Sequence, residues 1–138
     1  MDVCRVAILG GGNVALATSV ELSNAGFAVN MFELPEFKHN IQPIIEKGGI
    51  EYSGVTGKGF GKLNMVTTDI KKALKDVGMI ILTAPVFAHG QFVDACLPYF
   101  QDGQVLLTET AYFSMQKEMR RLLRLYRQLP ISWNYSNH

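Results

Sequence analysis

A glycine-rich turn near the N-terminus constrains the fold of this chain more than any other part of the sequence. The run Val3–Leu9 is apolar except for Arg5 and rich in β-branched residues, which is typical of a strand buried on both faces. The segment Gly10–Ala15, with the sequence GGGNVA, follows this run and fits the pattern G-x-G-x-x-G/A. A helix is expected over residues 13–24, and Gly26 closes it as a C-terminal cap. This part of the chain therefore predicts a strand, a glycine turn and a helix.

This arrangement is typical of dinucleotide-binding proteins, and each small residue has a physical role in it. Gly10 permits the tight turn out of the strand, Gly12 lets a pyrophosphate approach the backbone, and Ala15 lets the helix pack closely on the strand. The start of the helix presents free N–H groups and the positive end of its dipole to those phosphates. The alternative is a purely structural turn, because glycine-rich turns also join strands to helices in proteins that bind no nucleotide.

An acidic residue follows the second apolar run at the spacing that this motif requires. The run Phe27–Phe32 leads to Glu33, which lies 23 residues after Gly10. An acid at this position accepts hydrogen bonds from the ribose hydroxyls of adenosine. Glu33 disfavours a 2′-phosphate, and no arginine occurs in residues 34–37, so the sequence favours NAD. Lys38 leaves NADP open as the alternative.

Expected strands and helices alternate along the chain after Glu33. Helices are expected over 39–47, 70–75 and 86–100, strands over 65–67, 79–83 and 104–108, and a glycine-rich hairpin with strands over 50–53 and 59–63. Such alternation predicts an α/β fold with a doubly wound parallel sheet, the NAD(P)-binding Rossmann fold, with a small inserted hairpin and a C-terminal helix. The domain boundaries are expected at residues 1–113 for the Rossmann domain and 114–138 for a helix and tail.

The carboxyl ends of parallel strands meet at one edge of a sheet, which is where such folds bind their ligands. We expect the glycine turn, Glu33 and the segment Thr83–Pro85 to meet there, since Pro85 ends one strand and begins the next helix. The candidate cofactor-binding residues are Gly10, Gly11, Gly12, Asn13, Val14, Glu33, Thr83, Ala84 and Pro85.

His89 is the one histidine whose position suggests chemistry. It falls in the first turn of the helix expected after Pro85, near the nicotinamide end of a bound cofactor, where it could orient a substrate carboxylate or transfer a proton. The other interpretation, which we favour from the sequence, is a helix-surface histidine hydrogen-bonded to water. The sequence has no Cys/His/Asp cluster with metal-ligand spacing and no G-x-S-x-G motif, so we assign no metal ligand and no catalytic residue.

Residues 114–138 differ in composition from the rest of the chain. They carry five basic residues and one acidic residue, whereas residues 1–113 carry eight basic and eleven acidic residues. An apolar stripe at helical spacing runs through this segment. Its members are Met115, Met119, Leu122, Tyr126 and Leu129. We expect this basic amphipathic helix to pack through its apolar face in a homo-oligomer, and not on a membrane or nucleic acid. The alternative is that the helix folds back onto its own sheet, which would cover the stripe and leave a monomer.

Composition places the chain among globular proteins. Its 138 residues are 48% hydrophobic, but no apolar run approaches the roughly 18 residues that span a bilayer. The N-terminus carries no signal-peptide pattern. We expect Cys4 and Cys96 to be reduced and buried, and the protein to be cytoplasmic.

Residues 3–113 resemble the N-terminal domain of the opine dehydrogenase family and, more distantly, glycerol-3-phosphate dehydrogenases and ketopantoate reductases. The resemblance rests on the segments AILGGGNVA, FELPEF, NIQPIIEKGGIEYSG, GKLNMVTTDI, APVFAH and GQVLLTETAYF. It implies an enzyme that reductively couples an α-keto acid to the amino group of an amino acid, with hydride from NADH. Such enzymes carry their acid–base residues in a second, helical domain, which we expect to be absent from this chain, leaving it incomplete as an enzyme.

Two other classes of function stay open at this point. A non-catalytic module that senses NAD would suit the length of the chain, although such modules usually have an aspartate-rich end to the second strand. A methyltransferase that uses S-adenosylmethionine has a similar glycine loop, but it usually continues to an antiparallel seventh strand. Titration of NADH, NADPH and S-adenosylmethionine separates the three classes.

Overall fold

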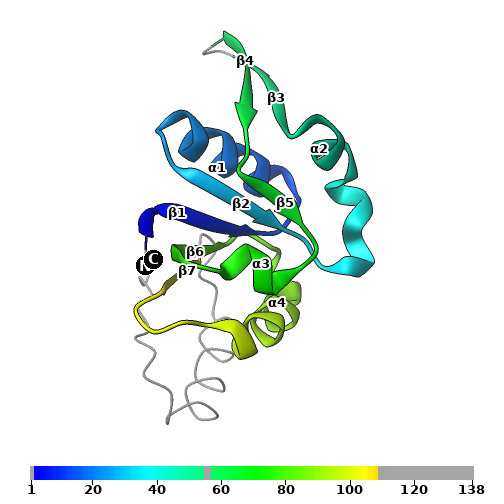
Figure 1. Cartoon of the computed structure of the whole chain (residues 1–138). Helices are drawn as coiled ribbons and strands as arrows, with labels where there is room; N and C mark the ends of the chain where they lie inside the picture. Colours follow the sequence, from blue (N-terminus) through cyan, green and yellow to red (C-terminus); the bar gives the residue numbers. More distant parts are fainter. Residues whose placement is uncertain (1, 55–56, 109–138) are drawn as a thin grey trace.

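The computed structural model describes residues 2–54 and 57–108, which form a parallel five-stranded sheet with helices on both faces (Figure 1). Its strands are β1 (Asp2–Leu9), β2 (Ala28–Phe32), β5 (Met65–Thr67), β6 (Val77–Leu82) and β7 (Val105–Thr108). Their spatial order is β5-β2-β1-β6-β7, and every neighbouring pair is parallel. In this Rossmann-type order the chain starts at the centre, builds one half of the sheet and then crosses over to the other half. The predicted α/β fold with a doubly wound parallel sheet is confirmed.

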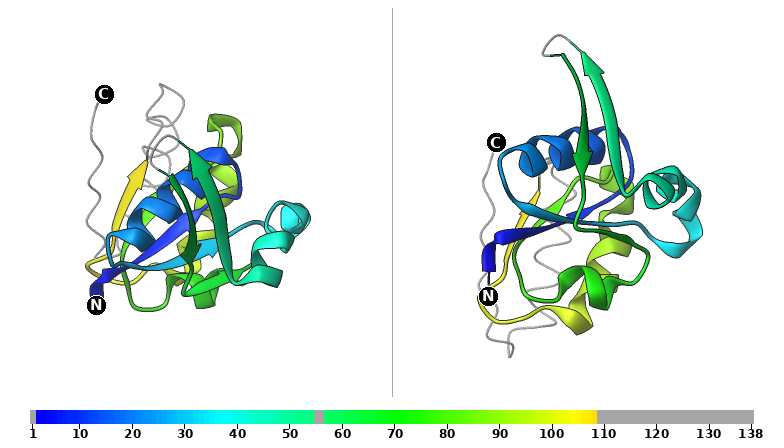
Figure 2. Two further views of the ribbon diagram at one scale, coloured as in Figure 1. Left: turned by 90° about the horizontal axis from the view of Figure 1, so that it is seen from above. Right: turned by 45° about the horizontal axis from the view of Figure 1, so that its top comes forward.

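The elements outside the sheet cover its two faces and form a separate hairpin. The helices are α1 (Asn13–Asn24), α2 (Gln42–Lys47), α3 (Ile70–Leu74) and α4 (His89–Cys96), with the 3-10 helices η1 (Pro35–Asn40), η2 (Val86–Ala88) and η3 (Leu97–Tyr99). The antiparallel hairpin consists of β3 (Gly49–Gly54) and β4 (Gly57–Lys62), close to the predicted ranges. It lies beside α1 and projects beyond the sheet (Figures 1 and 2).

Alternating side chains of the central strand β1 supply the two halves of the hydrophobic core. Val6 and Ile8 pack in a cluster with residues of α1, α2 and the hairpin, whereas Ala7 and Leu9 pack with residues of α3 and α4. All four side chains are at most 1% exposed. The strand is apolar without interruption here because both of its faces are covered.

The helix expected over residues 86–100 is divided into η2, α4 and η3. Pro98 lies in the first positions of η3 and lacks the N–H that would continue α4, so α4 ends at Cys96. The helix expected over 39–47 is likewise shorter. Its first residues belong to η1, where Phe37 has non-helical backbone angles, and α2 begins only at Gln42.

Of the two cysteines, only Cys96 is buried as predicted. The prediction for Cys4 was wrong, because Cys4 is exposed. The pairing of β1 with β2 begins at Arg5, and the pairing of β1 with β6 is irregular between Asp2 and Val6. Cys4 therefore lies where β1 extends beyond the regular sheet.

The predicted amphipathic helix and the oligomer contact through residues 114–138 lie outside the described residues. Within residues 2–54 and 57–108, every helix is too short or too polar to cross a lipid bilayer.

Candidate functional site

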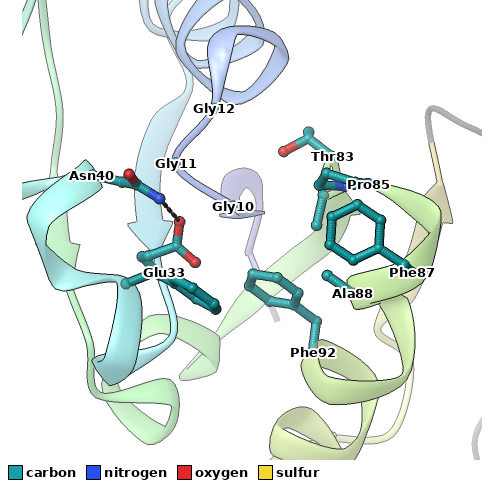
Figure 3. A pocket seen from close by; sticks show the side chains of 12 residues that line it. Gly10, Gly11, Gly12, Glu33, Asn40, Thr83, Pro85, Phe87, Ala88 and Phe92 are labelled. Atoms are coloured by element: carbon teal, nitrogen blue, oxygen red, sulfur yellow. Dashed lines mark hydrogen bonds between the residues drawn. The ribbon is translucent and has the colours of Figure 1, made fainter.

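A pocket of about 240 Å³ lies beyond the carboxyl ends of β1, β2 and β6 (Figure 3). It is lined by Gly10, Gly11, Gly12, Glu33, Phe37, Asn40, Thr83, Ala84, Pro85, Phe87, Ala88 and Phe92. The structure thus brings together the glycine turn, Glu33 and Thr83–Pro85, as expected from the predicted topology. Asn13 and Val14 are not part of the lining and are exposed in the first turn of α1.

Gly10 lies between the ends of two strands and has a backbone conformation that favours glycine. Its φ is +128°, and its N–H donates a hydrogen bond of 2.8 Å to the carbonyl of Phe32. A Cβ at this position would lie 2.8 Å from Oγ1 of Thr83. That hydroxyl donates a hydrogen bond of 2.9 Å to the carbonyl of Leu9 and is therefore held in place. Gly10 is required by the close approach of β1 to β2 and β6.

Gly12, by contrast, borders open space. Its φ is −86°, and a Cβ built on it would meet nothing within 4 Å. The first helical hydrogen bond of α1 runs from the N–H of Leu16 to the carbonyl of Gly12. The N–H groups of residues 13–15 consequently have no partner within the helix, as at the start of any α-helix. This open, positively polarised helix start can bind an anionic group.

The Glu33 side chain lies on the opposite side of the pocket from Thr83 and is buried, with 4% of its surface exposed. Its Oε1 accepts a hydrogen bond of 2.9 Å from the N–H of Leu34, and its Oε2 accepts one of 3.3 Å from Nδ2 of Asn40. Across the described part of the chain, no cation forms an ion pair with Glu33. The pocket therefore contains a carboxylate that is stabilised by hydrogen bonds alone.

Several residues that line the pocket were not singled out from the sequence. Phe37 and Asn40 come from η1, which folds back beside Glu33, and Phe87 comes from η2 and is 90% exposed. Phe92 packs edge-on against Phe32 at a centroid distance of 6.0 Å and makes the pocket apolar on that side. The sequence could have indicated Phe87 as a pocket residue, because it lies two positions after Pro85. No sequence pattern indicated Asn40.

Our interpretation of His89 as a helix-surface residue was wrong. His89 is only 1% exposed, and its Nε2–H donates a hydrogen bond of 2.7 Å to the carbonyl of Ala84. Burial lowers the pKa of this imidazole, and the hydrogen bond to Ala84 offsets part of that effect. His89 also does not line the pocket. Its contact with the backbone of the Thr83–Pro85 segment gives it a structural role beneath the site.

The described residues contain no group of three or more His, Cys, Asp or Glu side chains that could hold a metal ion. Gly12 and the start of α1 can bind phosphate, and Glu33 can accept hydrogen bonds from hydroxyl groups. The pocket therefore has the donors and acceptors for a nucleotide ligand.

No family model matches the chain. An opine dehydrogenase from Arthrobacter sp. (strain 1C) is 26% identical over 118 residues, which is 86% of this chain and 32% of that enzyme. The chain thus spans about a third of the length of this curated relative. Octopine dehydrogenase with NADH and pyruvate superposes with a TM-score of 0.74 at 22% identity, over 86% of this chain and 32% of the other. A PanE/ApbA family ketopantoate reductase from Ralstonia eutropha JMP134 gives a TM-score of 0.72 at 17% identity, over 95% and 40% of the two chains.

The sheet order, the glycine turn and these structural neighbours define a Rossmann-like α/β domain. Comparisons of sequence and of structure both find opine dehydrogenases as homologues of this chain. The resemblance predicted from the sequence motifs is confirmed.

Proposed function

We propose that this chain is the NAD(H)-binding domain of an opine dehydrogenase-like oxidoreductase. The observation that carries this proposal is that the open face of Gly12 and the carboxylate of Glu33 share one pocket. A dinucleotide needs N–H donors at its pyrophosphate and acceptors at its adenosine ribose, and the pocket offers both. The octopine dehydrogenase that superposes on this chain contains NADH and pyruvate, which supports the same class of ligand here.

In this proposal the residues of the chain orient the dinucleotide along the pocket. Glu33 accepts hydrogen bonds from the adenosine ribose, and the first turn of α1, including Asn13 and Val14, faces the pyrophosphate. Thr83–Pro85 borders the nicotinamide side. When bound, the nicotinamide supplies the hydride that reduces an imine formed from an α-keto acid and an amino acid. We assign no acid–base residue to that reaction.

Glu33 favours NADH over NADPH in this pocket. A 2′-phosphate would lie beside a buried carboxylate, and the described residues provide no cation paired with it. Like charges at such short range in a buried site repel strongly. The 2′-hydroxyl of the adenosine ribose in NADH can instead donate a hydrogen bond to the same carboxylate.

A non-catalytic module that senses NAD is the second candidate. It is favoured by one observation: Glu33 is the only acid–base side chain among the described residues that line the pocket, and it is already hydrogen-bonded. Both candidates bind NADH. Oxidation of NADH in the presence of paired keto acids and amino acids would exclude the sensing module, whereas binding without turnover fits either candidate, because we assign no acid–base residue to this chain.

The proposal is tested by thermal unfolding of the full chain with NADH, NADPH or S-adenosylmethionine. A ligand at 100 times its Kd stabilises the folded state by about 2.7 kcal/mol, which raises the Tm of a domain of this size by on the order of 10 °C. We expect NADH to raise the Tm most at equal ligand concentration. Stabilisation by S-adenosylmethionine alone, or by none of the three ligands, would contradict the proposal.

A further inference from the structure

Asn40, which the sequence did not single out, contacts the proposed ribose-binding carboxylate. It is the last residue of η1, and its Nδ2 donates a hydrogen bond of 3.3 Å to Oε2 of Glu33 (Figure 3). The other oxygen, Oε1, accepts from the N–H of Leu34. A carboxylate only accepts hydrogen bonds, so the Asn40 amide must present its NH₂ group to Glu33. Each oxygen of Glu33 thus has one donor from the protein.

These two donors matter because Glu33 has little other stabilisation. A buried carboxylate without a paired cation depends on its hydrogen bonds to keep one orientation. Each carboxylate oxygen accepts about two hydrogen bonds, so one position on each oxygen stays available after the contacts with Leu34 and Asn40. Two available acceptors match the two neighbouring hydroxyls of an adenosine ribose.

The glycine turn packs directly against this pair. A Cβ on Gly11 would lie 2.8 Å from Oε2 of Glu33 and 3.1 Å from Cβ of Asn40. The side chain of Ile41 approaches the same point, at 3.0 Å. The Glu33–Asn40 pair and the phosphate-binding turn therefore form one continuous surface, which would hold the ribose next to the pyrophosphate.

The geometry points to Asn40 as a positioning residue that sets the preference for NADH over NADPH by holding the Glu33 carboxylate toward the ribose. This inference rests on the proposed function. With Asn40 in place, the carboxylate is already oriented to accept from both ribose hydroxyls, and a 2′-phosphate meets a charge that is held beside it. Without Asn40, Oε2 loses its donor and the carboxylate can rotate. Binding of NADH then weakens, whereas binding of NADPH loses no such contact.

The test is a fluorescence titration of the full chain with NADH and with NADPH, for the wild type, Asn40→Ala and Asn40→Asp. Loss of a hydrogen bond to a charged group predicts that Asn40→Ala lowers the affinity for NADH by roughly tenfold. The ratio of NADH affinity to NADPH affinity should therefore decrease. Asn40→Asp keeps the shape of the side chain but replaces the donor with a second carboxylate. We expect it to weaken NADH binding more than Asn40→Ala does, because two like charges would face each other.

Gln42→Ala is the matched control. Gln42 donates from its amide to Oε1 of Glu46 over the same distance of 3.3 Å, but it does not line the pocket. Its replacement should leave both affinities unchanged.

Three outcomes overturn the inference, and they are distinguishable. If the wild type binds NADH but Asn40→Ala has the same ratio of NADH affinity to NADPH affinity as the wild type, Asn40 does not position Glu33 and the proposed function stands. If Asn40→Asp binds NADH like the wild type, only the shape of the side chain matters and the inference again fails alone. If the wild type binds neither dinucleotide, the proposed function fails and the inference fails with it.

Discussion

Gly10 and Gly12 are two residues apart, but they constrain the protein in different ways. In Gly10→Ala, the new Cβ would face Oγ1 of Thr83 at 2.8 Å with a backbone φ of +128°. We expect this variant to lose about 2 kcal/mol of unfolding free energy, because an L side chain is strained there and the hydroxyl is held by Leu9. Urea unfolding measures the loss. Gly12→Ala is the control and should stay within about 0.5 kcal/mol of the wild type. Equal losses in both variants would contradict this account of the turn.

His89 should make folding stability depend on pH. The unfolded chain binds a proton at His89 with a pKa near 6.5, and burial lowers that pKa in the folded state. The unfolded state therefore binds more protons below about pH 6.5, so stability is fully present above that pH and falls as the pH is lowered toward the folded pKa. His89→Gln keeps an amide donor for the carbonyl of Ala84 and should flatten this dependence. Urea unfolding between pH 5 and 8 measures both curves, and parallel curves would show that His89 does not contribute.

The sequence predicted part of the site residue by residue. Gly10, Gly12 and Glu33 could be found because the spacing of a local motif determines where they lie. Asn40 could not be found, since its contact with Glu33 depends on a 3-10 helix that folds back beside the strand end. The predicted surface position of His89 was wrong, because its burial depends on how the turn after Pro85 packs. That packing cannot be predicted from the local sequence.

Among the helices and strands, α3, β6 and the segment before β7 are connected by the side chain of Gln104. Its buried Nε2 donates hydrogen bonds to the carbonyls of Leu74 and Val77 at 2.8 and 3.1 Å, and its Oε1 accepts from the N–H of Gln101 at 2.8 Å. Gln104→Leu would remove all three of these hydrogen bonds and should cost about 2–3 kcal/mol of unfolding free energy. Gln91→Leu, at an exposed position of α4, is the control and should cost less than about 0.5 kcal/mol. If the two variants lose equal stability in urea, Gln104 does not join these elements.

Element type was easier to predict than element boundaries. The strands β2, β6 and β7 followed from largely apolar runs, of which only that of β2 contains a polar residue between apolar ones, Asn30; such runs are expected because both faces of this sheet are covered. The helix expected over residues 86–100 is too long because Pro98 ends α4 at Cys96, and a proline inside a helical pattern is a signal that the sequence itself contains. The 3-10 helix η1 had no comparable signal beyond Pro35, because its geometry depends on the contact with the pocket.

The whole molecule brings three separate parts of the chain to one sheet edge. The glycine turn after β1, Glu33 after β2 and Thr83–Pro85 after β6 surround one pocket because neighbouring parallel strands end on the same side. This convergence could be predicted from the alternation of strands and helices alone. The ligand that we propose for this pocket is NADH, bound through the open glycine turn.

The most direct test is calorimetric titration of NADH and NADPH into the full chain and into Gly12→Val. Gly12 has open space around it in this structure, so the valine should leave the fold intact and collide only with a bound pyrophosphate. Gly54→Val is the matched control, because a Cβ on Gly54 also meets nothing within 4 Å and Gly54 lies in the hairpin. We predict that the wild type and Gly54→Val bind NADH more tightly than NADPH, and that Gly12→Val binds neither while unfolding at the wild-type temperature. Undiminished NADH binding by Gly12→Val, or no binding by the wild type, would contradict the claim.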